Sequence, residues 1–249
     1  PWPPPPPPSP PPPPPPAPAW CATGVTDVTT NSGAVLSGVY REWVEGACWL
    51  LVLAYSHAAG ENDALVYDTF PASPTGSYSQ MQLSTLGVTN ADVAQTRWYC
   101  TTSAHSRVMD FATSNADVIA LVVSDDTTSL EASDFNTGFT ALTDHTAYLP
   151  AAADSVLSSG ISVTNFPFYL GGTYHWGLRG LGDRWECDDV ANDASQTTLH
   201  QVWVELAPPR KAMKLAVSVP FHCSLLREAG EKFAAALDDV SMQAPSFPV

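Results

Sequence analysis

Five side chains that carry oxygen fall within eight residues of the sequence and form the clearest candidate for chemistry. They are Glu186, Asp188, Asp189, Asn192 and Asp193. A hard cation such as Ca²⁺ takes about six to eight oxygen ligands, which carboxylates and side-chain amides supply. The spacing does not match an EF-hand, and acidic turns are often only solvated loops. The segment therefore predicts a candidate Ca²⁺ site, with a solvated loop as the alternative.

A second candidate site lies beside the acidic segment and is mainly aromatic. Its residues are Tyr174, His175, Trp176, Arg179 and Trp185. Aromatic faces can stack on a sugar ring while the arginine and nearby acids hydrogen-bond the sugar hydroxyls, which predicts a ligand-binding site for a glycan. Aromatic side chains also bury a large area and dominate packing. Burial in the core of the domain is therefore the alternative.

Catalytic motifs are weak in this sequence. His105, Ser106 and Asp110 have the residue types of a hydrolase triad, but no Gly-x-Ser-x-Gly elbow is present, and neighbours along one strand point to opposite faces. Nothing singles out two carboxylates for glycoside hydrolysis. We therefore predict that the chain is not an enzyme.

The five cysteines predict two disulfides and one remaining thiol. We pair Cys21 with Cys48 and Cys100 with Cys187, and Cys223 is left over, although spacing alone leaves the connectivity open. The chain has no Cys-x-x-Cys motif and no Cys/His cluster of the zinc type. Binding of a metal by thiolates is therefore not expected.

Short β-strands are the main elements that would position these residues. Runs rich in β-formers lie at residues 38–40, 48–55, 96–101, 107–111, 118–123 and 199–206. Helical signals are weaker at 83–93, where Thr89 is a candidate N-cap, and at 133–142. The strongest helical pattern is an amphipathic one at 224–240. Its apolar face would pack either on its own domain or on a neighbouring subunit. The sequence predicts an α+β fold with a mainly antiparallel, twisted sheet, few short helices and long loops.

The first eighteen residues, PWPPPPPPSPPPPPPPAP, hold 15 of the 24 prolines of the chain. Proline fixes φ and carries no N–H donor, so this segment predicts a polyproline II rod. At a rise of about 3.1 Å per residue, residues 3–16 would extend roughly 43 Å. Trp2 and Trp20 bracket the rod, and Trp2 has no domain of its own to enter. A neighbouring chain would give Trp2 a pocket.

Composition divides the chain into a rod (1–19), a globular domain (20–206) and a tail that contains the amphipathic helix (207–249). The domain contains five Arg, no Lys and 21 of the 25 acidic residues, whereas the tail contains five basic and four acidic residues. The net charge of −15 argues against a nucleic-acid partner, because phosphate binding needs clustered Lys and Arg. No apolar run approaches the ~20 residues that cross a bilayer. Because residue 1 is Pro and no signal segment precedes it, we expect a processed or partial product.

Cys21 is followed by SGVY at 37–40 and by CWLLVLA at 48–54. This order resembles the opening of fibrinogen C-terminal-like domains, the group that includes the intelectin and ficolin lectins. The segments that look like a divergent microbial or algal branch of the group are 97–107, 166–177 and 183–189. The resemblance covers roughly residues 21–206. It implies a fibrinogen-like domain and, as a function, calcium-dependent binding of glycans by a lectin.

The polyproline segment with its following domain resembles the hydroxyproline-rich wall and flagellar-hair glycoproteins of green algae. That resemblance implies a secreted, extracellular glycoprotein whose prolines are hydroxylated and carry arabinose-rich glycans. No Asn-x-Ser/Thr sequon occurs in the chain, so N-glycans are not expected. The predicted glycosylation sites are Pro4, Pro5, Pro6, Pro7, Pro8, Ser9, Pro10, Pro11, Pro12, Pro13 and Pro14.

Two functions follow from these observations. The first is a structural subunit of an extracellular glycoprotein fibre or wall layer, in which copies of the chain assemble into a filament through the polyproline arm and the globular domain. The alternative is a calcium-dependent lectin that binds glycans, with the rod as a stalk.

Overall fold

The computed structural model describes residues 16–61, 65–76, 78–124, 138–149, 168–170, 174–178, 185–188 and 195–208, with only the backbone at 169–170 and 174–175. The chain divides into two units, residues 1–209 and 210–249, and every described residue lies in the first unit. The predicted rod up to residue 15 and the predicted helix at 224–240 lie outside the described residues.

The described part of the chain consists mainly of strands. The strands are β1 (Gly24–Thr29), β2 (Val35–Val44), β3 (Ala47–His57), β4 (Val66–Tyr67), β5 (Tyr78–Gln80), β6 (Val93–Thr102), β7 (Met109–Thr113), β8 (Phe139–Ala141), β9 (Phe168–Leu170), β10 (Tyr174–Leu178), β11 (Trp185–Cys187) and β12 (Thr198–Leu206). The helices are α1 (Ala116–Ser124) and the 3₁₀ turns η1 (Ala19–Cys21), η2 (Leu83–Leu86) and η3 (Asn90–Asp92). This content agrees with the predicted sheet-rich α+β class.

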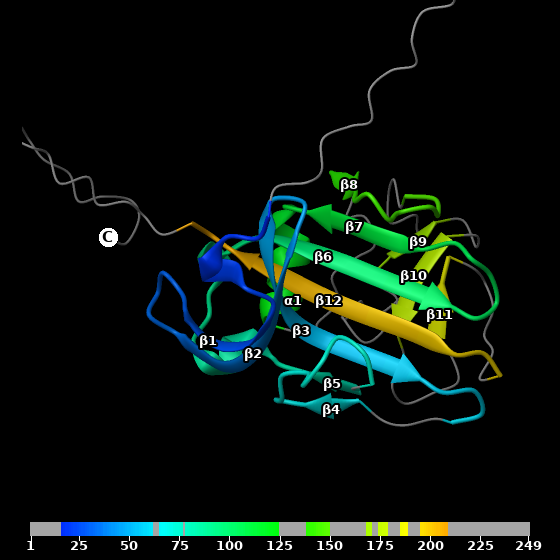
Figure 1. The fold of residues 1–249 in the computed structure, drawn as a ribbon, viewed down its shortest axis with the longest axis horizontal. Helices are drawn as coiled ribbons and strands as arrows, with labels where there is room; N and C mark the ends of the chain where they lie inside the picture. Colours follow the sequence, from blue (N-terminus) through cyan, green and yellow to red (C-terminus); the bar gives the residue numbers. More distant parts are fainter. Residues whose placement is uncertain are drawn as a thin grey trace, which may run out of the picture. The chain divides into compact units, whose positions relative to one another are not determined.

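The main sheet has the strand order β1-β2-β3-β12-β6-β7-β8, with β5 added to β3 and β4 added to β5 (Figure 1). Among the described strands, only the β4–β5 pair is parallel. One edge of β3 pairs with β2 at residues 47–50 and with β5 at residues 53–55, while β12 runs along the other edge. A second sheet has the order β11-β10-β9. The longest predicted strands, at 48–55, 96–101 and 199–206, are confirmed as β3, β6 and β12.

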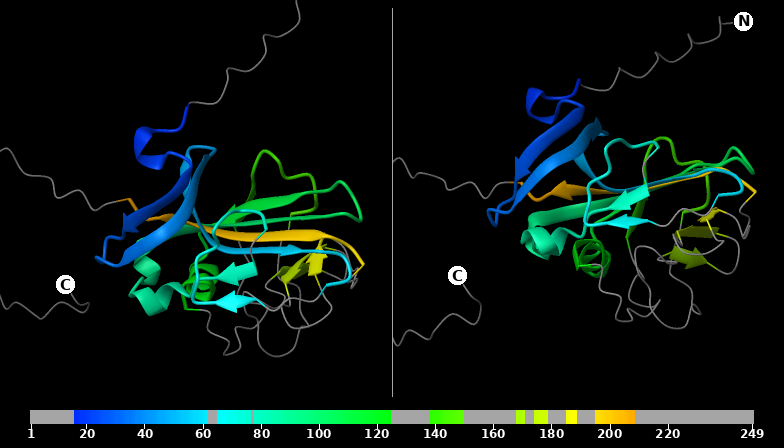
Figure 2. Two further views of the ribbon diagram at one scale, coloured as in Figure 1. Left: turned by 60° about the horizontal axis from the view of Figure 1, so that its bottom comes forward. Right: turned by 90° about the horizontal axis from the view of Figure 1, so that it is seen from below.

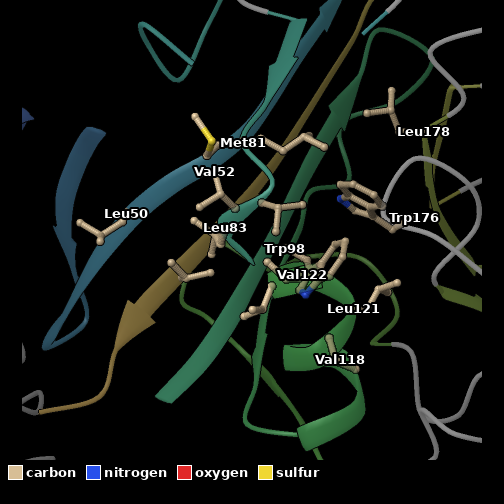
Figure 3. Close-up of a cluster of buried hydrophobic side chains, with 14 of the residues drawn as sticks. Leu50, Val52, Met81, Leu83, Trp98, Val118, Leu121, Val122, Trp176 and Leu178 are labelled. Carbon is tan, nitrogen blue, oxygen red and sulfur yellow. The ribbon is translucent and has the colours of Figure 1, made fainter. Parts of the chain in front are cut away.

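The main core lies on one face of the large sheet. Side chains alternate between the faces along each strand, so Trp98 of β6 points into this core and Arg97 points to the opposite face. Helix α1 and the small sheet lie on the core side (Figure 2). Trp98 packs edge-on against Trp176 and Phe168, with ring centroids 4.8 and 4.7 Å away, and Figure 3 shows Trp98 and Trp176 beside the apolar residues of α1. Burying each such side chain contributes about 2–3 kcal/mol.

The prediction of a strand at 118–123 is wrong, because these residues belong to α1. Asn115 caps the helix: its side-chain oxygen accepts hydrogen bonds from the backbone N–H groups of Asp117 and Val118, at 2.9 and 3.1 Å. A residue with this pattern of hydrogen bonds is a preferred N-cap. The helix buries the side chains Val118, Ile119, Leu121, Val122 and Val123. Continuous apolar sequence therefore reflects a buried helix here, not a buried strand.

The segment 83–93 forms two 3₁₀ turns, η2 and η3, instead of one helix. Thr89 is the N-cap of η3, as expected, and forms a capping box with Asp92. Gly87 adopts a left-handed conformation with φ 82° and ends η2, which prevents a continuous helix. The helix predicted at 133–142 is contradicted where it is described, because residues 139–141 form β8.

Candidate functional site

Two of the predicted calcium ligands, Glu186 and Asp188, are described, and both are buried. Asp188 has φ 56°, a left-handed conformation that is uncommon for a residue other than glycine. The Nε of Arg107 donates to the Oδ2 of Asp188, and the Nη2 of Arg107 donates to the backbone carbonyl oxygen of Asp188 at 2.9 Å. Arg107 thus compensates the charge of this carboxylate and holds Asp188 at the end of β11. The Asp188 carboxylate therefore has a structural role at this position.

The other predicted ligands, Asp189, Asn192 and Asp193, lie outside the described residues. Within the described ranges, no group of three or more His, Cys, Asp or Glu side chains has the arrangement of a metal site. A calcium site at this place therefore remains a prediction.

The two tryptophans of the predicted sugar-binding wall are buried: Trp176 is 0 % and Trp185 is 1 % exposed. Trp176 donates its indole N–H to the carbonyl oxygen of Tyr99 at 3.0 Å, and Trp185 stacks on His57 with ring centroids 3.7 Å apart. Both rings therefore belong to the core, and neither presents an open face to a sugar. Arg179 and the side chains of Tyr174 and His175 lie outside the described residues.

The core contains two buried histidines that sequence reasoning missed. His200 is 0 % exposed, and its Nε2 donates to the carbonyl oxygen of Glu186 at 2.9 Å, which leaves Nδ1 without a proton. His57 is 3 % exposed and donates from Nε2 to the carbonyl oxygen of Glu61 at 2.8 Å. Burial, followed by the repulsion from His57, lowers the pKa of His200 to about 4, although the bond to Glu186 opposes this shift. His200 is therefore neutral in the folded protein at neutral pH.

We expect the free energy of unfolding to fall as the pH drops from about 6.5 to about 4, because the unfolded chain then protonates His200 and the folded chain does not. His200 contributes stability above pH 6.5 that is lost toward pH 4, by up to about 3 kcal/mol. Urea unfolding of the wild type and of His200→Gln at several pH values measures this effect. The variant should show a shallower pH dependence, and identical slopes would contradict the assignment.

A buried charged cluster lies on the opposite face of the main sheet. Arg97 donates to both carboxylate oxygens of Asp110 at 2.7 and 2.8 Å and to Glu42 at 2.8 Å, and its guanidinium lies 5.6 Å from the ring centroid of Trp203. Burial would lower the pKa of Arg97, but the hydrogen bonds and charges of Asp110 and Glu42 outweigh this effect and raise it. His105 bonds to backbone groups through both ring nitrogens. Asp110 and His105 therefore do not act as members of one triad.

The predicted disulfides are both present, as Cys21–Cys48 and Cys100–Cys187. The first of them fixes the point at which the proline-rich segment joins the domain. Cys21 is fully buried, and its backbone N–H donates to the carbonyl oxygen of Pro18 at 2.8 Å. Cys48 lies at the start of β3, so the junction is bonded covalently to a strand inside the main sheet.

An apolar groove lies beside this junction, with a cavity volume of about 480 Å³. Its lining residues are Trp20, Val28, Thr29, Thr30, Asn31, Arg41, Cys48, Leu50, Glu205, Leu206, Ala207 and Pro208. Trp20 is 64 % exposed, and its ring is nearly perpendicular to that of Trp43, with ring centroids 5.7 Å apart. Most of the Trp20 side chain is therefore accessible to a ligand. The groove is in the size range of about 300–1,000 Å³ that is typical of binding pockets.

Hydrogen bonds hold the two sides of the groove together. The side-chain nitrogen of Asn31 donates to the carbonyl oxygens of Ala207 and Pro208, both at 3.1 Å. Asp92 accepts from the backbone N–H of Ser32 at 2.8 Å, and its own carbonyl oxygen accepts from the N–H of Ala207 at 2.7 Å. Segments distant in sequence are thereby fixed as one surface.

Asp92, which helps to hold the groove, is buried and stays ionised. Burial alone would raise the pKa of this carboxyl, but the hydrogen bonds from Thr89 and Ser32 outweigh burial and lower it to about 2. The groove therefore keeps its hydrogen-bonded frame over the pH range in which His200 titrates.

Comparison of the chain with family models, curated proteins and solved structures found no match. The functional conclusions below therefore rest on the sequence and on the geometry of the described residues. Trp20 was singled out by its position at the end of the proline segment. The other lining residues could not be recognised from the sequence, because the groove forms only when residues 28–50 and residues 205–208 come together in the fold.

Proposed function

We propose that this chain is a structural subunit of an extracellular glycoprotein fibre or wall layer, which assembles through its polyproline arm and its globular domain. The observation that carries the proposal is the Cys21–Cys48 disulfide, three residues after Pro18. A force applied to the arm would reach β3 through this covalent bond and would bypass β1 and β2. The arm is thus attached in the way that a structural tether requires.

No helix in the described part of the chain is long and apolar enough to cross a bilayer. Two other observations support an extracellular structural role. Two disulfides are compatible with an oxidising compartment such as the outside of a cell. The proline-rich arm has the composition of a stiff spacer. In this role the chain acts mechanically and not as a catalyst.

Removing residues 1–16 should prevent assembly while leaving the domain folded. Full-length and truncated protein, each secreted from a host that hydroxylates proline, would be compared by sedimentation velocity and by electron microscopy. The expected result is filaments or large assemblies for the full chain only, with the same thermal unfolding midpoint of the domain for both. A matched control replaces residues 3–16 with a Gly/Ser segment of the same number of residues, which keeps the contour length but not the stiffness. Equal assembly of truncated and full-length protein would rule out the proposal.

Glycan binding by a lectin remains the alternative and is tested separately. Trp176 and Trp185 are buried, so these two rings give it no support. Its own test is a glycan array with and without EDTA, on the wild type and on Asp189→Ala. Binding that both EDTA and the substitution abolish would favour the lectin.

A further inference from the structure

The groove beside Trp20 has the chemistry of a receptor for a polyproline II segment. Proline-rich peptides dock into grooves lined with aromatic rings, where the prolines pack on ring faces. Trp20 supplies such a ring, and Val28, Leu50 and Leu206 supply apolar walls. The contact with the perpendicular ring of Trp43, whose centroid is 5.7 Å away, helps to position the exposed ring of Trp20 beside the groove.

The hydrogen-bonding groups of the groove also match a proline segment. Polyproline has backbone acceptors but no backbone N–H donors. Among the described residues, the indole N–H of Trp20 has no hydrogen-bond acceptor, and Arg41 uses only its Nε, which donates to the carbonyl oxygen of Ala22 at 3.0 Å. The terminal nitrogens of Arg41 and the indole N–H are thus donors for the carbonyl oxygens of a bound proline segment. An ordinary peptide would also bring N–H groups that need acceptors.

Charge favours the arm over other parts of the same protein as the ligand. The chain carries a net charge of −15, so two domains repel one another, whereas residues 1–19 contain no charged side chain. The arm can therefore approach a second acidic domain without this repulsion, and its carbonyl oxygens would be attracted by Arg41.

The arm of the same chain is poorly suited to fill the groove. Only Ala17, Pro18 and Ala19 separate residues 3–16 from Trp20 of the groove, and Pro18 accepts a hydrogen bond from the N–H of Cys21 at 2.8 Å. A stiff polyproline II rod, in which each proline fixes φ, would have little chain in which to turn into a groove that begins at its own root. The segment that fits the groove therefore comes from another copy of the chain.

We propose that the groove formed by Trp20, Val28, Arg41, Leu50, Leu206 and Pro208 binds the proline-rich segment 3–16 of a second copy. This inference rests on the proposed function, because it names the contact through which the subunits would assemble. Such a contact joins two different surfaces, the arm of one copy and the groove of the next. It is heterologous, and it generates a filament if it does not close into a ring.

A synthetic peptide of residues 3–16 tests the contact. Both the unmodified peptide and its 4-hydroxyproline form would be titrated by calorimetry into the full-length chain, held at a concentration at which sedimentation velocity shows a monomer so that the groove is not occupied by a second copy. A Gly/Ser peptide of equal length is the ligand control. We expect saturable binding of at least one proline form and none of the Gly/Ser peptide. Binding of neither proline form would overturn the inference.

Substitutions in the groove show whether the peptide binds there. Trp20→Ala should weaken binding about tenfold or more, and Arg41→Met, which removes the donors but keeps the length, should weaken it several-fold. The matched control is Tyr67→Ala, which removes another exposed ring, on β4, that is not part of the groove. Unchanged affinity in both Trp20→Ala and Arg41→Met would overturn the inference even if the peptide binds. Thermal unfolding of each variant checks that the domain is intact.

The two proposals fail in different ways. If the protein assembles but the peptide does not bind, the inference about the groove is wrong and the structural function stands. If the peptide binds at the groove but the full chain never assembles, the groove is a proline receptor and the assembly function is wrong.

Discussion

Replacing Asp110 with alanine is expected to lower the free energy of unfolding by about 3–5 kcal/mol. Arg97 and Asp110 are 5 % and 1 % exposed, and two hydrogen bonds of 2.7 and 2.8 Å join them. Without Asp110 the guanidinium stays buried against Trp203 and retains Glu42 alone as its acidic partner. Removing one member of a buried pair is costly because the other charge loses its compensation but remains away from water.

Urea unfolding at pH 7 measures this effect, and two variants serve as controls. The first control is Glu42→Gln. The carboxylate of Glu42 lies 2.8 Å from the same guanidinium, but the Glu42 side chain is 24 % exposed. Glu42→Gln should therefore lower the free energy of unfolding clearly less than Asp110→Ala does. The double variant Arg97→Met, Asp110→Leu removes both charges and should recover much of the stability. A cost below about 1 kcal/mol for Asp110→Ala, the range of surface pairs, would contradict the prediction.

Removing the Cys100–Cys187 disulfide should destabilise the domain by about 5 kcal/mol, and removing Cys21–Cys48 should cost about 4 kcal/mol. The two bonds span sequence separations of 87 and 27 residues. A disulfide stabilises by restricting the unfolded chain, and the restriction grows with the length of the closed loop. Removing the disulfide that closes the longer loop, Cys100–Cys187, should therefore lower the free energy of unfolding more.

Paired substitutions to serine test this ranking without leaving a single reactive thiol. Each double variant would be compared with the wild type by chemical unfolding under conditions that keep the remaining disulfide oxidised. We expect the free energy of unfolding to be highest for the wild type, lower for the double variant Cys21→Ser, Cys48→Ser, and lowest for the double variant Cys100→Ser, Cys187→Ser. Equal or reversed losses would show that local packing around Cys187 or Cys21 outweighs the length of the loop.

Strands were predictable from the sequence where alternation was clear and turn residues bounded the run. The segment 118–123 was not, because six consecutive apolar residues carry no period that separates a buried strand from a buried helix. The deciding feature is polar and lies before the run: Asn115 accepts the first backbone hydrogen bonds of α1. At 83–93, Gly87 interrupts the helix by adopting a positive φ.

The candidate sites were less predictable than the strands, because their contacts join distant residues. The proposed disulfide pairs are present, but the acidic residues Glu186 and Asp188 are buried in the core region instead of forming an open turn. The charged partner of Asp188, Arg107, lies 81 residues before it. Likewise, only the pairing of β12 with β3 brings His200 near His57. No local pattern of residue types encodes these contacts.

The bonds from Asn31 to Ala207 and Pro208 also bear on how such a domain can spread among proteins. They place the last described residues of the first unit beside the groove that Trp20 lines, so the polypeptide enters and leaves this fold at nearly one place. A domain with neighbouring ends can be inserted into a loop of an unrelated protein, or duplicated in tandem, without rearranging its strands. We therefore expect that the described fold could be joined to proline-rich segments of different length, or inserted into another chain, without disturbing the main sheet.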